Sequence, residues 1–207
     1  MTKLTIPTTQ ANVPYEALKN PDLPIETVAS IHLHNGKTAD FILAEKNVYG
    51  ATNVFVNADG NAFGELPMYE YENIKRPVCY AESDRVKQLE KMLELFPDEL
   101  RDMMIEREIK QIVKGKSSSV TAKLWTPSTT EIFGEGKNPC DVDDVHFSFF
   151  NSEKSRIIES DERGTWFYAL RSPTPSRSGY FDGCGTNGFY SSGIASYAYC
   201  VRCGFLL

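Results

Sequence analysis

The feature that most constrains the fold of this chain is an abrupt change in composition after Glu162. From Arg163 to Leu207 the sequence contains no Lys, Glu, Gln or Met, and Gly, Ser, Tyr and Phe dominate. Low complexity of this kind usually indicates disorder, but disordered segments carry few aromatic residues. We therefore predict that this segment is ordered, loop-rich β structure built onto the preceding residues.

Length, charge and cysteine content limit the kind of protein further. A chain of 207 residues suits one domain with an extra arm, and it can bury a core without disulfides or metals. The net charge of −6 argues against nucleic acid or an anionic membrane as the main partner. No apolar run has the length of a signal peptide or a membrane span, so we expect synthesis in the cytoplasm and no membrane insertion. Five cysteines, an odd number at scattered spacings, indicate free thiols.

The first half of the chain predicts an arm followed by a hairpin. Residues 1–25 are rich in Thr, Pro and Asn, which favours an extended N-terminal arm, while residues 26–207 form the ligand-binding domain. Apolar and polar residues alternate from Val28 to Leu43, and Asn35-Gly36 predicts a type I′ turn between two strands. A third strand is expected at Val54–Val56.

Between Ser83 and Val113 the apolar spacing becomes helical. One helix is expected to end near Phe96, and Pro97 is expected to start a second. The apolar stripe of this second helix would be Leu100, Met104, Ile105, Ile109 and Ile112. Ser128 and Glu131 have the spacing of a capping box, which predicts a short helix ending at Gly134.

Three blocks of residues follow in order through the second half of the chain. They are Leu124, Trp125, Pro127, Ser128, Glu131, Phe133 and Gly134; then Leu170-Arg171-Ser172-Pro173; and then Val201-Arg202 with Phe205. In this pattern the chain resembles a bacterial and phage domain whose members carry L-W-x-P-S-x-x-E-x-F-G, then W-x-L-R-S-P, and close with G-V-R-P-A-F. The resemblance covers roughly residues 27–207. Cys200, Cys203 and Gly204 depart from the pattern, so the final strand is expected to differ locally.

Several members of that family are variable proteins of diversity-generating retroelements, similar in role to the phage major tropism determinant. The resemblance implies an α+β chain with a C-type-lectin-like fold of the formylglycine-generating-enzyme type: a small twisted antiparallel sheet, two helices and a loop-rich C-terminal binding face. It implies a receptor-binding protein of a phage tail or another displayed surface, without enzymatic activity, metal or cofactor. The partner would be a protein or glycan receptor on a target cell. A homo-oligomer, or attachment to a virion through the N-terminal arm, stays open.

The window from Thr174 to Tyr199 is the expected ligand-binding region. Retroelements of this kind rewrite adenines in Asn codons, which never yields Lys, Glu, Gln, Met or Trp, and the window contains none of these five. Five Gly, five Ser and four Tyr among its 26 residues also match an antibody paratope, because Tyr gives amphipathic contact area at low rotamer cost while Ser and Gly adapt. By the family pattern, Phe181, Gly188 and Ala195 are frame residues. The positions expected to vary and to bind are Thr174, Arg177, Gly179, Tyr180, Gly183, Gly185, Asn187, Phe189, Tyr190, Ser191, Ser192, Gly193, Ile194, Ser196, Tyr197 and Tyr199.

Other candidate sites have simpler interpretations. Cys200 and Cys203 have C-x-x-C spacing, but a zinc site needs a second close pair, so two unrelated thiols are favoured. His32 and His34 are expected on the exposed face of a strand. The Asp141–Asp144 run has oxygens for calcium but lacks the other features of such a loop, so a solvated loop is favoured. Arg171 and Arg202 are expected to fix backbone carbonyls.

Two other functions stay open beside receptor binding. An oxidase related to the formylglycine-generating enzymes would use copper and two converging thiols, for which Cys184 and Cys200 are the candidates. A structural tail or adhesin module would instead pack its C-terminal face against another subunit.

Overall fold

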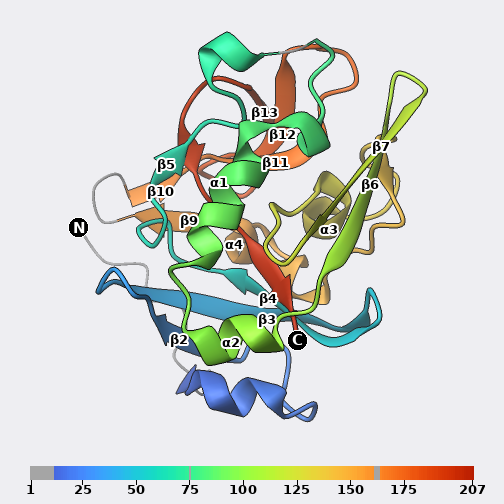
Figure 1. Ribbon diagram of the computed structural model, residues 1–207. Helices are drawn as coiled ribbons and strands as arrows, with labels where there is room; N and C mark the ends of the chain where they lie inside the picture. The colour runs from blue at the N-terminus through green and yellow to red at the C-terminus, as the bar shows by residue number, and fades with distance from the viewer. Residues whose placement is uncertain (1–11, 75, 161–163) are drawn as a thin grey trace.

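The computed structural model describes residues 12–74, 76–160 and 164–207. Strands dominate, with four short α-helices among the described residues, so the chain has a mixed α/β fold. Figure 1 shows two main sheets at opposite ends of the molecule, with the helix α1 running between them. The first eleven residues of the predicted arm lie outside the described residues.

The first sheet joins the predicted hairpin to the C-terminal strand. Its strands, in spatial order, are β1 (Asn12–Val13), β2 (Val28–His32), β3 (Thr38–Val48), β4 (Ala51–Asn57) and β15 (Gly204–Leu206). The predicted strands on both sides of the hairpin and at Val54–Val56 are confirmed. Phe205 is fully buried, and its ring centroid lies 5.1 Å from that of Phe41 and 5.6 Å from that of Phe55. The end of the chain is therefore part of the main core.

Two details near the N-terminus differ from the sequence predictions. The turn at Asn35-Gly36 is not type I′, because only Gly36 has a positive φ and its N–H donates to Leu33 O. This pattern fits a three-residue loop with Gly in the left-handed position. Residues 12–25 do not extend away as an arm: β1 pairs with β2, and Leu18 in the 3-10 helix η1 (Tyr15–Lys19) is fully buried.

The first predicted helix is confirmed and the second is largely wrong. Helix α1 covers Asp84–Leu93, but α2 covers only Asp98–Met103 and is followed by the strand β6 (Arg107–Val113). Burial alternates along β6 with a period of two, so Ile109 packs inward while Ile112 faces out. The isoleucines that fitted a helical stripe therefore lie on a strand.

Strand β6 belongs to a three-stranded sheet with β7 (Lys116–Ala122) and β8 (Asp141–Val142). Lys114 and Gly115 connect β6 to β7, and both have positive φ, at 50° and 77°. Positive φ at both central residues is the requirement of a type I′ turn. A Lys-Gly pair meets it here, although Asn-Gly is the stronger sequence signal.

The second five-stranded sheet carries the C-terminal window. Its strands, in spatial order, are β13 (Tyr190–Ile194), β12 (Tyr180–Cys184), β11 (Tyr168–Pro173), β14 (Tyr199–Cys200) and β5 (Glu65–Leu66). The remaining strands pair as β9 (Ile158–Ser160) with β10 (Gly164–Trp166). The composition-based prediction of ordered β structure is thus confirmed for the described residues after Glu162.

Short helical segments complete the chain. They are η2 (Tyr71–Asn73), η3 (Tyr80–Glu82), α3 (Thr129–Phe133), η4 (Ser148–Phe150) and α4 (Glu153–Arg156). The predicted capping box of α3 is present, because the Ser128 side chain accepts from the Glu131 N–H and Glu131 accepts from the Ser128 N–H. Within the described residues, no helix is long and apolar enough to cross a bilayer.

Candidate recognition surface

The motif residues Glu131 and Arg171 form the centre of a buried ion-pair network. Arg171 Nη1 donates to Glu131 Oε2 at 2.7 Å, and Arg107 donates to both Glu131 and Asp144. The Tyr49 hydroxyl donates to Glu131 Oε1 at 2.8 Å. Glu131 and Arg171 have no exposed surface. Charges taken out of water to this extent are tolerated only when they are paired and hydrogen-bonded, and this network pairs two carboxylates with two guanidiniums.

The same network sets the protonation of Glu131. Burial alone would raise the pKa of this carboxyl, but Arg171 and Arg107 outweigh burial and lower the pKa to about 2. The carboxylate is therefore charged at any physiological pH. Since it also caps α3, it connects that helix to β11 through Arg171.

The Asp141–Asp144 run is not the solvated loop that the sequence favoured. Only Asp143 is exposed. Asp144 pairs with Arg107 and Arg171, while Asp141 accepts from Thr130 N and Ser172 Oγ. Burial raises the pKa of Asp141 to about 6. These carboxylates support the frame, and among the described residues no group of three or more His, Cys, Asp or Glu side chains is arranged to hold a metal ion.

The other motif residues also belong to the frame. Arg171 Nη1 donates to Thr126 O, and Arg202 Nη1 donates to Arg156 O, so both arginines fix backbone carbonyls as expected. Trp125 and Phe205 are fully buried. Trp166 is only half-buried, and in this respect it differs from the other two aromatic motif residues.

A second buried polar centre lies inside the window itself. Asp182 on β12 has no exposed surface and accepts hydrogen bonds from four side chains. Two of the donors, Thr129 and Asn138, come from outside the window, and two, Thr174 and Tyr190, come from inside it. Thr174 and the hydroxyl of Tyr190 therefore help to hold the hairpin in place. Burial beside Asp182 raises the pKa of Tyr190, which keeps its hydroxyl a donor.

Three predicted binding positions are glycines that face the protein. A Cβ on Gly183 would lie 2.1 Å from the Phe167 ring, and a Cβ on Gly193 would lie 2.6 Å from the Tyr199 hydroxyl. Gly179 is buried beneath the Arg76 side chain. Aromatic groups of the chain occupy the space above Gly183 and Gly193, and the Arg76 side chain lies beside Gly179. Contact of a ligand with these three glycines stays a prediction.

The positions expected to bind differ widely in exposure, and Thr174 is buried together with the three glycines. Among the positions expected to bind, five side chains are exposed: Arg177, Asn187, Phe189, Tyr190 and Tyr197. The three expected frame residues, Phe181, Gly188 and Ala195, are all buried. Other members of the set are partly exposed, namely Tyr180, Gly185, Ser191, Ser192, Ile194, Ser196 and Tyr199.

These exposed side chains form two groups and not one face. Strands β12 and β13 are antiparallel, so Asn187, Phe189 and Tyr190 lie at one end of the hairpin, and the loops at 175–178 and 195–198 lie at the other. Five-residue strands separate the two ends by about 17 Å. We call the end that contains Arg177 and Tyr197 the tyrosine end.

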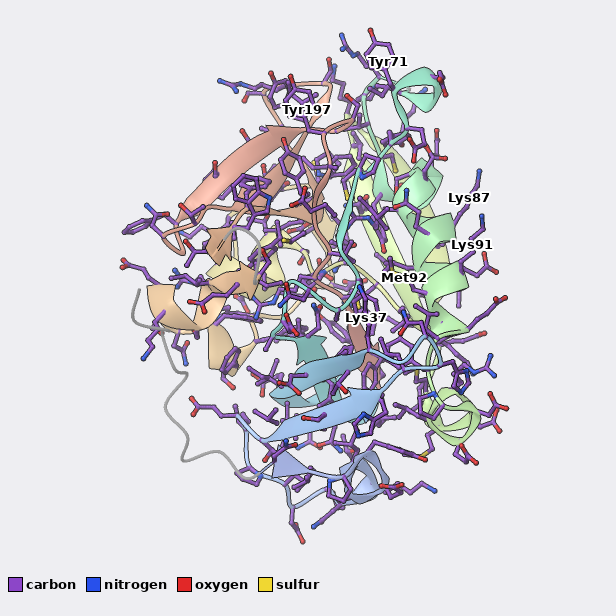
Figure 2. The ribbon with its side chains drawn as sticks, turned by 90° about the vertical axis from the view of Figure 1, so that its left-hand side faces the viewer. Lys37, Tyr71, Lys87, Lys91, Met92 and Tyr197 are labelled. Atoms are coloured by element: carbon purple, nitrogen blue, oxygen red, sulfur yellow. The ribbon has the colours of Figure 1, made fainter. Side chains whose placement is uncertain are left out.

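One exposed aromatic residue at the tyrosine end was not predicted. Tyr71 in η2 is 82% exposed, and Tyr197 is 58% exposed. Figure 2 shows the two side chains at the same end of the molecule. The segment before Tyr71 is attached to the window, because the backbone N–H groups of Met68 and Tyr69 both donate to Ala195 O. No periodicity or motif marks Tyr71 in the sequence.

The cysteines and histidines show no comparable arrangement. All five cysteines are buried free thiols, and burial raises the pKa of Cys184, and raises that of Cys203 to about 12. Nucleophilic or metal-binding thiol chemistry needs the thiolate, which burial disfavours here. His32 and His34 are exposed, as expected, and His32 Nδ1 lies 2.9 Å from Thr38 Oγ1.

Together these features define a mixed α/β domain in which a buried ionic frame supports an exposed, aromatic C-terminal hairpin. The chain belongs to the family described as a domain of unknown function, DUF6273, which it matches over residues 43–207. No curated protein and no solved structure matches the chain.

Proposed function

We propose that this chain is a non-enzymatic receptor-binding protein whose C-terminal hairpin is a diversified recognition surface. In this proposal the domain is a C-type-lectin-like variant related to the variable proteins of diversity-generating retroelements. It is carried on a phage tail or another displayed surface, and its partner is a protein or glycan receptor on a target cell.

One observation carries the proposal. The window from Thr174 to Tyr199 lacks the five residue types that adenine rewriting of Asn codons never yields, and its exposed side chains stand between buried frame residues. Exposed positions such as Arg177 and Tyr197 can change without disturbing a core, whereas Phe181 and Ala195 cannot. A surface with this division tolerates rewriting.

The physical chemistry of the window also suits recognition. Binding energy in interfaces concentrates in a few Tyr, Trp and Arg side chains. The tyrosine end presents Arg177, Tyr197 and the nearby Tyr71, and its loops carry small residues that adapt to a partner. Since the window contains only one basic and one acidic residue, Arg177 and the buried Asp182, affinity should depend only mildly on salt.

Sequencing the locus in many isolates of the source population tests the diversification directly. We expect a reverse-transcriptase gene nearby and a near-copy of the 3′ end of this gene that differs only at adenines. Substitutions between isolates should fall on exposed window positions and spare Phe181, Asp182, Gly188 and Ala195. Uniformly scattered differences, or an invariant window without a template copy, would contradict the proposal.

A further inference from the structure

A groove of about 330 Å³ opens beside the tyrosine end. One side is the end of β6 and the turn after it, Ile112–Gly115, and another is Pro173 followed by Thr174, Pro175, Arg177 and Ser178 at the start of the window. Pro77-Val78 and Pro139-Cys140 contribute the rest of its lining. Its size is at the lower end of the range typical of ligand sites.

The walls of this groove are fixed by contacts within the chain. The Val78 N–H donates to Ser178 O, and the Ile112 N–H donates to Cys140 O. Asn138 Nδ2 donates to Pro173 O at 2.9 Å. Because these bonds join the four contributing segments, the groove is preformed and binding there needs little ordering of the backbone.

The lining is apolar with a positively charged edge. Ile112 is a large apolar side chain left 44% exposed, and the exposed prolines Pro77, Pro139 and Pro175 line the groove with it. Among the described residues, Lys114 and Arg177 are the charged members of the lining, and no Asp or Glu contributes to it. In a chain with a net charge of −6, two cations beside apolar walls favour an acidic, apolar ligand.

We propose that this groove binds an extended segment of a protein receptor in which an apolar side chain lies next to a carboxylate. The apolar side chain packs against Ile112 and the exposed prolines of the lining, and the carboxylate faces Lys114 and Arg177. This inference rests on the proposed function and refines it: Arg177 belongs to the diversified window, whereas Ile112 and Lys114 lie outside it. The groove is then a constant anchoring point whose other wall is adjusted by diversification.

Two short capped peptides test this assignment by NMR on the full chain. Acetyl-Leu-Asp-Leu-Asp-amide is titrated against the neutral acetyl-Leu-Asn-Leu-Asn-amide. We expect the acidic peptide to shift the amide resonances of Val78, of residues 112–115 and of Arg177, and to bind at least about fivefold more tightly than the neutral one. Equal affinities, absence of binding by both peptides, or shifts confined to another surface would overturn the proposal.

Charge reversals inside and outside the groove test whether binding of the acidic peptide depends on the groove itself or on the overall charge of the protein. Lys114→Glu should weaken the acidic peptide by about fivefold or more, and Ile112→Ser should weaken both peptides. Lys87→Glu makes the same charge change at an exposed residue of α1 that does not line the groove, and it should leave both affinities unaltered. Equal weakening by Lys87→Glu and Lys114→Glu would contradict a local site.

A third titration distinguishes the kind of macromolecule. If a sulfated tetrasaccharide shifts the same resonances and the peptides do not, the groove belongs to a glycan site and the peptide assignment is wrong. Sequencing of isolates tests whether the window is diversified, and it does not test binding in the groove. A failure of the peptide titration therefore leaves the proposed function standing, and a failure of the sequencing test does not depend on the groove.

Discussion

Two regions of the molecule differ in what they bury and what they expose. One is the junction of α3 with β11, and the other is the tyrosine end of the second sheet. At the junction, Glu131, Arg171 and Arg107 are charged groups kept away from water by mutual pairing. At the tyrosine end, Tyr71 and Tyr197 are large aromatic groups kept in water. Paired buried charges restrict the chain to one arrangement, whereas exposed aromatic side chains leave binding energy for a partner. In the proposed function, a frame of the first kind would keep the fold intact while residues of the second surface change.

The largest expected effect is at the centre of the frame. Glu131→Ala removes one carboxylate from two buried guanidiniums and also removes the cap of α3, so it should lower the free energy of unfolding by about 3–5 kcal/mol. Chemical denaturation measures the change. The exposed neighbour Asp143 has a φ of 61°, which Asn tolerates as Asp does, so Asp143→Asn serves as the control and should cost less than about 0.5 kcal/mol. Near-equal stabilities would show that the network does not hold the frame.

The next largest loss of stability is expected at a buried glycine of the window, and it tests whether this position belongs to the frame or to the surface. Gly183→Ala places a Cβ against the Phe167 ring, where the available distance is 2.1 Å, and should cost about 1–3 kcal/mol of stability. Gly185→Ala is the matched change at a roomier position, with its nearest atom at 3.2 Å, and should cost clearly less. If both variants unfold at the same denaturant concentration, Gly183 belongs to the variable surface after all.

The carboxyl of Asp141 should make the free energy of unfolding depend on pH. Its folded pKa of about 6 lies above the unfolded value, so its stabilising contribution is present at low pH and is lost as pH rises through 6. Between pH 7.5 and pH 5 this group should add about 1 kcal/mol of stability. Glu131 adds no pH dependence in that window, because its folded pKa of about 2 and its unfolded value both lie below it.

Asp141→Asn isolates this contribution, since the variant retains a side chain of the same shape. The difference in unfolding free energy between parent and variant, measured at several pH values, should be constant above about pH 7, begin to change as pH falls through 6, and change most steeply near pH 5. A difference that is flat from pH 5 to 7.5 would mean that Asp141 titrates outside this range.

The smallest effect on stability is expected at the surface. Replacing Arg177, Phe189 and Tyr197 with Ser should change the free energy of unfolding by less than about 0.5 kcal/mol per residue. Thr174 and Tyr190 are left out because both donate to the buried Asp182. Thermal unfolding of the triple variant provides the check, and loss of a cooperative transition would place these side chains in the core.

The sequence predicted local features well where one interaction decides them. The capping box of α3, helix α1 and the β hairpin each depend on a few neighbouring residues. The stripe ending in Ile109 and Ile112 failed because isoleucines spaced by three fit a helix as well as a strand whose alternate face is exposed, and β pairing with residues 116–122 decided the outcome.

The candidate site was predictable to a similar degree. Composition located the window, but it could not show that Gly183 and Gly193 lie beneath aromatic rings, because Phe167 and Tyr199 reach them only through sheet geometry. Nor could it locate Tyr71, which follows Met68 and Tyr69, whose backbone N–H groups donate to Ala195 O in the window. Such contacts between distant segments leave no local signal.

The most direct test of the recognition surface is a binding measurement with the folded triple variant. Fluorescently labelled parent protein is first used to find bacterial strains to which it binds, and the Arg177, Phe189 and Tyr197 to Ser variant is then compared on the same cells. Since an anchor residue contributes about 2 kcal/mol or more, we expect binding to fall by at least about thirtyfold while the melting curve is retained. Unchanged affinity of the variant for the same cells would contradict a recognition surface at the C-terminal hairpin.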